Sequence, residues 1–262
     1  MRRLLALPLV ATLLLACWLR VSGYPNVLAD GAVRPLTNDA VYHVRRSLET
    51  VRHFPHVPMR DSLLDWPHGD DCLWAPGYDF ISALFVIALG AGGDEQRAAV
   101  IVVFVPVVLG LLVVLLVGRV VRTLALPERD AAGAAAIARL LCAGMPIAIF
   151  SSQLGRTDHH VTEAMTVLML LLIALARVGV DTVGSSAAKA SPAARWRFEL
   201  GTAFAIAFGL FVWTGSTLYV VLALLVLVGA AAAEPTHPER PWPHVVGSGA
   251  PGALLGATLG LG

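Results

Sequence analysis

The chain has 262 residues, of which 57% are hydrophobic and 14% are charged, whereas soluble domains contain about 45–50% and about 25%. This composition predicts a membrane protein. The 19 Lys and Arg residues nearly balance the 18 Asp and Glu residues, which leaves no basic surface for nucleic acid and no acidic tail, so we expect no nucleic-acid partner.

Several apolar runs are long enough to cross a bilayer, which takes about 20 helical residues. We expect the first run to be an uncleaved helix, although the N-terminus also resembles a signal peptide. The run over 200–233 would measure about 50 Å as one helix, so we predict a hairpin that turns at 213–216. Residues 245–262 resemble the start of another span. The expected spans are approximately 4–19, 98–117, 131–150, 161–178, 200–213 and 217–233.

The run over 80–92 is too short to span, and we interpret it as an interfacial or re-entrant helix. Short cytoplasmic loops are enriched in Lys and Arg, so the two arginines after Met1 place the N-terminus inside. If 80–92 does not span, the basic segments 118–130 and 179–199 are also inside, and 21–97 is an external loop. We therefore predict a multi-pass protein of the cell membrane whose functional segments face outward.

The expected external loop over 21–97 is long and polar, and such loops in compact proteins are usually functional. Asn38 or Asp39 is suited to cap an external helix, and a cap alone would also explain Asp39. The loop has four histidines, at positions 43, 53, 56 and 68. Because their spacing matches no ordinary metal-ligand pattern, we expect them to be solvated loop residues.

A second polar segment, Gly155 to Glu163, joins two long apolar runs. Ionisable side chains at membrane depth are costly, and they usually face a cavity, a metal or a partner charge. One Asp or His would serve an ordinary polar loop, whereas Asp158-His159-His160-x-x-Glu163 gathers several metal-ligand types. The sequence therefore predicts a functional site at this junction, on the same face as the long loop.

Five motifs lie on the segments that we expect outside. In chain order they are Asp39-x-x-Tyr42-His43-x-Arg45, the aromatic-Pro-x-Gly of 66–69, the Trp/Pro/Asp cluster at 74–79, Ser152-x-x-Gly155-x-x-Asp158-His159-His160-x-x-Glu163, and Trp213-x-Gly215-Ser216. Their order and spacing resemble the catalytic subunit of the oligosaccharyltransferases, membrane enzymes that attach a lipid-linked glycan to asparagine. The Asp-His-His triplet also marks a soluble phosphoesterase family, but its α/β domain is excluded by this apolar composition.

The resemblance implies an all-α fold of the GT-C type, a polytopic membrane bundle of about six helices with short helices in the external loop. It also implies a divalent-metal site held by Asp39, Asp158 and His160, with His159 and Glu163 nearby as outer contacts or donor-phosphate contacts. Carboxylate oxygens suit Mg²⁺ or Mn²⁺, and one imidazole favours Mn²⁺. Asp39 would have a catalytic role, positioning the acceptor nitrogen.

The implied activity is protein N-glycosylation, a glycosyltransferase reaction. A polyprenyl-linked (pyro)phosphate would donate its glycan to the asparagine of an Asn-x-Ser/Thr sequence, so the expected partners are the lipid-linked donor, an acceptor polypeptide and membrane lipid. The family's later helices and soluble C-terminal domain have no counterpart here. We therefore interpret 1–262 as an incomplete transmembrane domain and expect it to be inactive alone.

Two alternatives to this activity stay open at the level of sequence. Another GT-C glycosyltransferase, acting on hydroxyl or lipid acceptors, would share an external acidic loop but would not need the Asp-His-His junction. A non-catalytic membrane protein or transporter would account for the spans, but its polar residues would be expected within the spans rather than on external loops.

Overall fold

The computed structural model describes residues 2–124, 126–182 and 192–233. This part of the chain is predominantly helical, which confirms the all-α prediction. Its β-structure consists of two short antiparallel pairs, β1 (Leu28–Ala29) with β2 (Ala32–Val33) and β3 (Arg60–Asp61) with β4 (Asp70–Asp71). The partial span expected at 245–262 lies outside the described residues.

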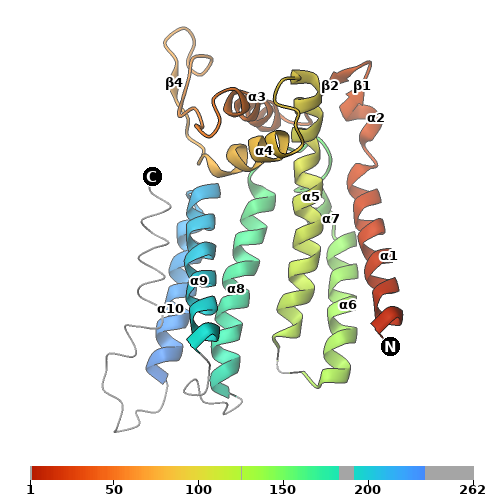
Figure 1. Cartoon of the computed structure of the whole chain (residues 1–262), viewed down its shortest axis with the longest axis vertical. Coiled ribbons are helices and arrows are strands. Elements are labelled where there is room, and N and C mark those ends of the chain that lie inside the picture. The colour runs from red at the N-terminus through yellow and green to blue at the C-terminus, as the bar shows by residue number, and fades with distance from the viewer. Residues whose placement is uncertain (1, 125, 183–191, 234–262) are drawn as a thin grey trace.

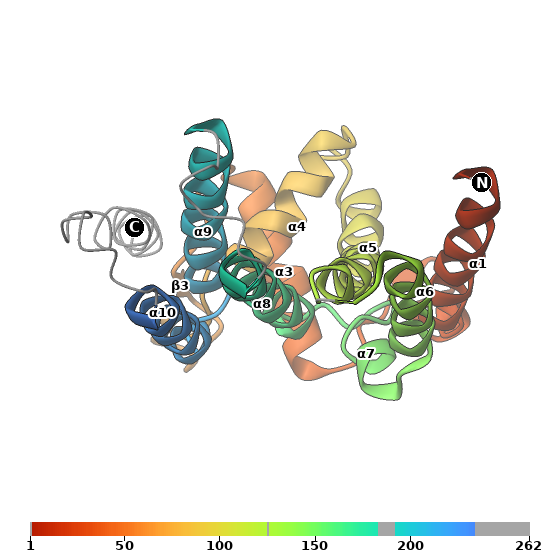
Figure 2. The same ribbon diagram turned by 90° about the horizontal axis from the view of Figure 1, so that it is seen from below.

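Long helices form the body of the molecule and run side by side along its long axis (Figure 1). Seen from below, they form an open row from α1 through α6, α5 and α8 to α9 and α10 (Figure 2). The predicted hairpin at 213–216 is present, because one helix ends at Val212 and the next begins at Ser216. The helices of the row are α1 (Arg2–Val21), α5 (Glu95–Arg122), α6 (Glu128–Gly144), α8 (His160–Thr182), α9 (Pro192–Val212) and α10 (Ser216–Ala233).

The expected single helix over 131–150 is interrupted. α6 ends at Gly144, and a separate short helix, α7, covers Pro146–Phe150. The break follows from Pro146, which has no backbone N–H and disfavours helical backbone at the residue before it. Within the described residues, the segments Leu7–Val27 and Glu95–Arg122 are long and apolar enough to cross a membrane by length and composition.

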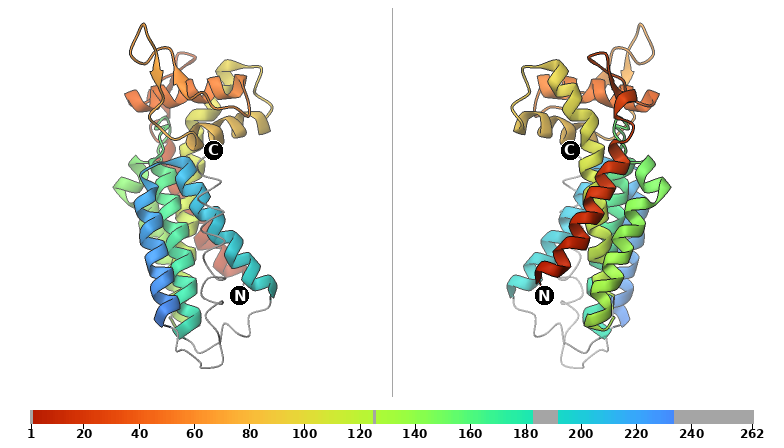
Figure 3. Two further views of the ribbon diagram at one scale, coloured as in Figure 1. Left: turned by 90° about the vertical axis from the view of Figure 1, so that its left-hand side faces the viewer. Right: turned by 90° about the vertical axis from the view of Figure 1, so that its right-hand side faces the viewer.

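A second layer lies across one end of the row and contains α3 (Asn38–Arg52) and α4 (Gly77–Ala88) (Figures 1 and 3). A short helix, α2 (Tyr24–Val27), connects α1 to this layer. The cap of α3 is Thr37 rather than the expected Asn38 or Asp39, because Thr37 has an extended backbone and its hydroxyl accepts the Ala40 N–H at 3.2 Å. The run over 80–92 contributes to α4, which packs on α3 and α5 instead of joining the row.

The ends of the long helices separate the polar segments into two groups (Figure 1). The start of α1, the turn between α5 and α6 and the end of α8 lie at one end of the row. The loop over 22–94, the junction over 151–159 and the hairpin turn at 213–216 lie at the other end. The two segments that carry the sequence motifs therefore meet on one side of the molecule.

Arg20, at the end of α1, holds the turn at Ser152, three residues before Gly155, in place. Its side chain is buried, and its Nε donates to Ser152 Oγ at 2.8 Å. Its guanidinium also donates to carbonyls at the ends of α6 and within α7, which the helix break leaves without intrahelical partners. Gly110 of α5 permits this contact, since a Cβ there would lie 2.5 Å from Ser152 Oγ.

Gly155 sets the direction in which the junction leaves this anchor. Its φ is +79°, in the left-handed region, and its N–H donates to the Val103 carbonyl at 3.1 Å. Its own carbonyl accepts the Leu36 N–H at 3.0 Å. A Cβ at this position would lie 2.8 Å from a methyl group of Val27. Both the backbone conformation and the close packing therefore require glycine.

We predict that Gly155→Ala lowers the free energy of unfolding by about 1–3 kcal/mol, the usual cost of left-handed backbone in a residue with a side chain. The measurement is thermal unfolding of the detergent-purified protein. Gly133→Ala is the matched control, because Gly133 lies within α6 with nothing within 4 Å of its Cβ position. It should be neutral or slightly stabilising, and equal melting temperatures for the two variants would contradict the prediction.

Candidate metal centre

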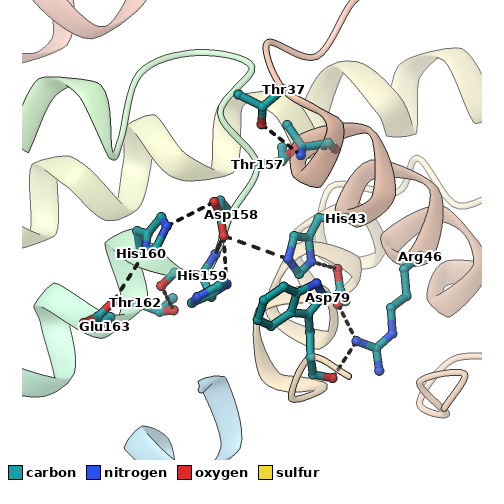
Figure 4. A network of polar contacts seen from close by, with 12 residues as sticks. Thr37, His43, Arg46, Asp79, Thr157, Asp158, His159, His160, Thr162 and Glu163 are labelled. Carbon is teal, nitrogen blue, oxygen red and sulfur yellow. Dashed lines mark hydrogen bonds and ion pairs between the residues drawn. The ribbon is translucent and has the colours of Figure 1, made fainter. Parts of the chain in front are cut away.

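The candidate site lies where the junction contacts the second layer, just before α8 (Figure 4). Thr157 donates its hydroxyl proton to the Ala40 carbonyl of α3 at 2.7 Å, and both partners are buried. This bond brings Asp158, which is only 2% exposed, beside the first two turns of α3. The segment over 21–97, which was expected to be an external loop, therefore approaches the junction in the structure.

One arm of the site extends from Asp158 towards α8 and α10. His160 Nε2 lies 3.4 Å from Asp158 Oδ2, and His160 Nδ1 lies 3.3 Å from Glu163 Oε2. Glu163 also accepts a hydrogen bond from the Tyr219 hydroxyl at 2.8 Å. The contact of Nδ1 with Glu163 has hydrogen-bond geometry, whereas the contact of Nε2 with Asp158 does not, so the proton of the neutral imidazole belongs on Nδ1 and the lone pair of Nε2 faces Asp158. The spacing i, i+3 at the start of α8 produces this pairing.

A second arm extends from Asp158 into the second layer, and the sequence did not predict it. His43 Nδ1 lies 2.9 Å from Asp79 Oδ1, and both side chains are at most 1% exposed. Arg46 Nη1 contacts the other oxygen of Asp79 at 3.2 Å, and Ser47 donates to Oδ1 at 3.2 Å. His43 Nε2 then lies 4.0 Å from Asp158 Oδ1.

The expectation that all four loop histidines are solvated is wrong for His43 and right for His53, His56 and His68, which are exposed. The reason is the face of α3 on which His43 lies. The buried residues of this helix recur every three or four positions, as on any half-buried helix, and His43 is one of them: Ala40, His43, Val44, Arg46, Ser47, Thr50 and Val51. That periodicity, read along 40–51, was the signal that could have identified it.

His159 fills the space between the arms. Its ring stacks near Trp74 and Trp213, with centroids 5.2 Å and 5.8 Å away, and it is buried. Its backbone N–H donates to Asp158 Oδ1 at 2.7 Å. Its Nδ1 is also 2.7 Å from that oxygen, but the angle is unsuitable for a hydrogen bond, so the nitrogen has no hydrogen-bond partner.

Asp158 is held in its charged form. Burial alone would raise the pKa of this carboxyl, but contact with His159 and the proximity of the His160 and His43 rings favour the carboxylate, so its pKa lies below the usual value. An ionised carboxylate among imidazoles is a metal-ligand set. Among the described residues, two groups have ligand atoms within 4.8 Å of one another, namely His43 with Asp158 and His159, and His159 with His160 and Glu163.

Asp39 lies apart from both groups of ligand atoms. It is exposed in the first turn of α3, one turn before His43, and its neighbour Ala40 is the residue that Thr157 contacts. The backbone of Asp39 is thus next to the junction, while its carboxylate has no hydrogen bond or ion pair within the described part of the chain. Its role as a metal ligand remains a prediction.

Comparisons with known proteins find similar sequences and similar folds. Dolichyl-phosphooligosaccharide-protein glycotransferase 1 of Archaeoglobus fulgidus is 28% identical over 166 residues, which are 63% of this chain. A second glycotransferase of the same organism is 26% identical over 167 residues, so the chain is similar in sequence to part of the archaeal oligosaccharyltransferases. The oligosaccharyltransferase AglB from the same organism, solved with an inhibitory peptide and a dolichol-phosphate, has the same fold over 99% of this chain, with a TM-score of 0.73 and 20% identity.

A third match is the A. fulgidus oligosaccharyltransferase in complex with Zn and sulfate, with a TM-score of 0.68, 20% identity and 97% of this chain covered. No family model matches the chain. The match covers only 26% of the length of the curated relative, and the structural matches cover 33% and 34% of the solved chains. The likeness therefore concerns one part of these larger proteins.

We predict that Asp79→Ala strongly destabilises the protein, by about 3–5 kcal/mol, because it leaves the buried Arg46 without its counter-charge. Chemical or thermal unfolding in detergent measures the change. The control is Asp71→Ala, which removes an ion pair with Arg60 in which the carboxylate side chain is 82% exposed. It should change stability by no more than about 0.5 kcal/mol. Equal losses would show that the Asp79 cluster is not the anchor of the second layer.

Proposed function

We propose that the chain is the metal- and donor-binding part of an oligosaccharyltransferase that acts in protein N-glycosylation. The observation that supports this most directly is the pair Asp158 Oδ2 and His160 Nε2, 3.4 Å apart, with Glu163 behind the imidazole. The pair belongs to a fold that matches AglB over almost the whole chain. The comparisons contain no support for a transporter or for a glycosyltransferase with hydroxyl or lipid acceptors.

The residues present suit a divalent cation. A separation of 3.4 Å between a carboxylate oxygen and an imidazole nitrogen is compatible with two ligands that each lie about 2.0–2.2 Å from one ion. We propose Mn²⁺ or Mg²⁺ as the ion, Asp158 and His160 as ligands, and Asp39 as a third ligand after a change of its side-chain rotamer. The ion would supply positive charge that stabilises the departing phosphate.

The chain's own residues would then orient the two substrates. His159, stacked among the tryptophans, offers its ring to the donor phosphate, and Asp39 positions the acceptor amide nitrogen. This nitrogen forms a bond to the anomeric carbon of the glycan. The bond from that carbon to the phosphate oxygen breaks with its electron pair on the oxygen, and one amide proton passes to the Asp39 carboxylate. Polyprenyl-linked donors and Asn-x-Ser/Thr acceptors are proposed by analogy with the relatives, one of which was solved with dolichol-phosphate and a peptide.

We further propose that the six long helices span a membrane, with the metal centre on the external face of the cell membrane. Their outward surfaces carry large exposed apolar side chains, which lipid would cover. Examples are Leu14, Leu141, Leu200, Leu222 and Leu225. Arginines at 119 and 122 lie at the opposite end from the site, as the enrichment of basic residues in cytoplasmic loops requires.

The first test of this function uses the complete polypeptide and measures transfer from a polyprenyl-linked glycan to an Asn-x-Ser/Thr peptide, with and without Mn²⁺. Asp158→Asn and Asp39→Asn should each reduce transfer to background, because an amide keeps the shape but lacks the charge that binds a hard cation. The double variant should be no worse than either single variant. Glu163→Gln should reduce transfer by about 10–100-fold, as expected for an outer partner of a ligand.

The control for this assay is Asp65→Asn, which changes the same chemical group at an exposed loop position and should leave transfer unchanged. Metal-independent transfer, or full activity in Asp158→Asn, would falsify the assigned role of the junction.

The second test concerns the membrane. Arg122 and His56 are both exposed. Arg122 is the last residue of α5 and His56 follows α3, so they belong to opposite ends of the row of helices (Figure 1). In intact cells, an impermeant thiol reagent should label a cysteine introduced by His56→Cys and should label one introduced by Arg122→Cys only after permeabilisation. Because the native cysteines also react, the two changes are made in a chain with Cys17, Cys72 and Cys142 replaced by alanine. Labelling of Arg122→Cys from outside, with none at His56→Cys, would reverse the proposed orientation.

A further inference from the structure

We propose that His43 is a ligand of the ion bound at Asp158, contributing its Nε2 from the buried side of the centre. This inference deepens the proposed function and rests on its metal centre. It adds a residue from α3 to the ligands expected from the Asp-His-His junction, on the Oδ1 side of Asp158. His43 and His160 belong to different groups of ligand atoms, so a side-chain rotation of His160 would be needed for one ion to contact both.

The tautomer of His43 is fixed by its surroundings. Its Nδ1 lies 2.9 Å from Asp79 Oδ1, and the carboxylate of Asp79 can only accept a hydrogen bond. The proton of the neutral imidazole therefore belongs on Nδ1, and the lone pair belongs on Nε2. Metal-binding histidines generally have this arrangement, with the ring N–H donated to a carboxylate that orients the ring and increases the basicity of the other nitrogen.

The position of Asp79 is itself determined by other residues. Arg46 contacts its Oδ2, and Ser47 donates to its Oδ1. The ring of His43 is also enclosed by Tyr42 and Tyr78, each with a centroid 5.3 Å away in an edge-on arrangement. These contacts leave the imidazole little freedom, so the direction of its Nε2 is a fixed property of the fold.

That direction points to Asp158. His43 Nε2 is buried and has no hydrogen-bond partner among the described residues, and it lies 4.0 Å from Asp158 Oδ1. His159 Nδ1 is buried and unpartnered as well, and it lies 2.7 Å from the same oxygen. Buried polar atoms normally have partners. A cation bound at Asp158 Oδ1 would give His43 Nε2 the partner that it lacks.

The ligand set also indicates which cations fit. The group His43, Asp158 and His159 offers up to two nitrogens and one oxygen, all within 4.8 Å of one another. Sites with nitrogen and oxygen ligands bind Co²⁺ more tightly than Mn²⁺, whereas Mg²⁺ prefers oxygen ligands and retains several waters. With His43 as a ligand, the centre should therefore bind Mn²⁺ or Co²⁺ more tightly than Mg²⁺.

The test measures metal binding by the 262-residue chain in detergent, with no glycan transfer involved. Binding of Mn²⁺ is measured as the loss of the electron paramagnetic resonance signal of the free ion. Nitrogen coordination is detected through the coupling of ¹⁴N to bound Mn²⁺ and through the visible absorption of bound Co²⁺. The key variant is His43→Asn, because its amide can still donate to Asp79 where Nδ1 did but cannot reach the position of Nε2. His56→Ala, at an exposed histidine of the same loop, is the control.

We expect His43→Asn to weaken Mn²⁺ binding by at least tenfold, to reduce the ¹⁴N coupling and to change the Co²⁺ spectrum, with little change in melting temperature. His56→Ala should change none of these. If His43→Asn instead binds both ions with unchanged affinity and spectra while Asp158→Asn does not bind, the metal centre stands and the role of His43 is wrong. Absence of binding by the unmodified chain would overturn both. A third outcome would separate the two proposals. If the unmodified chain binds metal, His43→Asn loses that binding and the complete polypeptide transfers no glycan, only the proposed enzymatic function is overturned.

Discussion

The buried ion pair between Arg46 and Asp79 is the interaction on which the site depends, because it joins α3 to α4 and fixes the position of His43. Arg46 is 2% exposed and Asp79 is not exposed at all. Burying such a pair yields little net stability, since removing both charges from water offsets most of their attraction. The contribution of the pair is instead to select one packing of α3 on α4. Arg46 also donates to the Trp74 and Pro58 carbonyls, so a single guanidinium defines how the loop from 53 to 76 folds back over α3.

The two carboxylate oxygens of Asp158 face different histidines, and each oxygen therefore belongs to one of the two arms of the site. Oδ2 faces His160, which Glu163 orients, and Glu163 is tied to α10 through Tyr219. Oδ1 faces His159 and His43, and His43 is oriented by Asp79. Each arm has the order carboxylate, imidazole, central carboxylate. One arm begins on the bundle and the other on the second layer, so the geometry at Asp158 is sensitive to how these two parts are packed together.

Much of the fold could be predicted from the sequence because its signals are local. The apolar runs gave the long helices, and the length of 200–233 gave the hairpin that turns after Val212. The break at Pro146 was also local, but it was overlooked within an apolar run. In the site, the Asp-His-His triplet identified Asp158 and its neighbours from their sequence alone. Asp79 and His43 were not identified, because they are 36 residues apart and only the packing of α3 on α4 brings them together.

The difference between local signals and tertiary packing also explains why the exposure of Asp39 could not be predicted from the sequence. A cap position and a ligand position were both compatible with an acidic residue at the start of a helix, and the sequence does not say which side chain turns inward. Thr37 caps the helix, so Asp39 does not, and the Asp39 carboxylate lies in solvent one turn before His43. A helix presents residues four apart on the same face. A rotation of the Asp39 side chain about its own bonds, with no movement of α3, is therefore the smallest change that would bring a second carboxylate towards the ion proposed at Asp158 and His160.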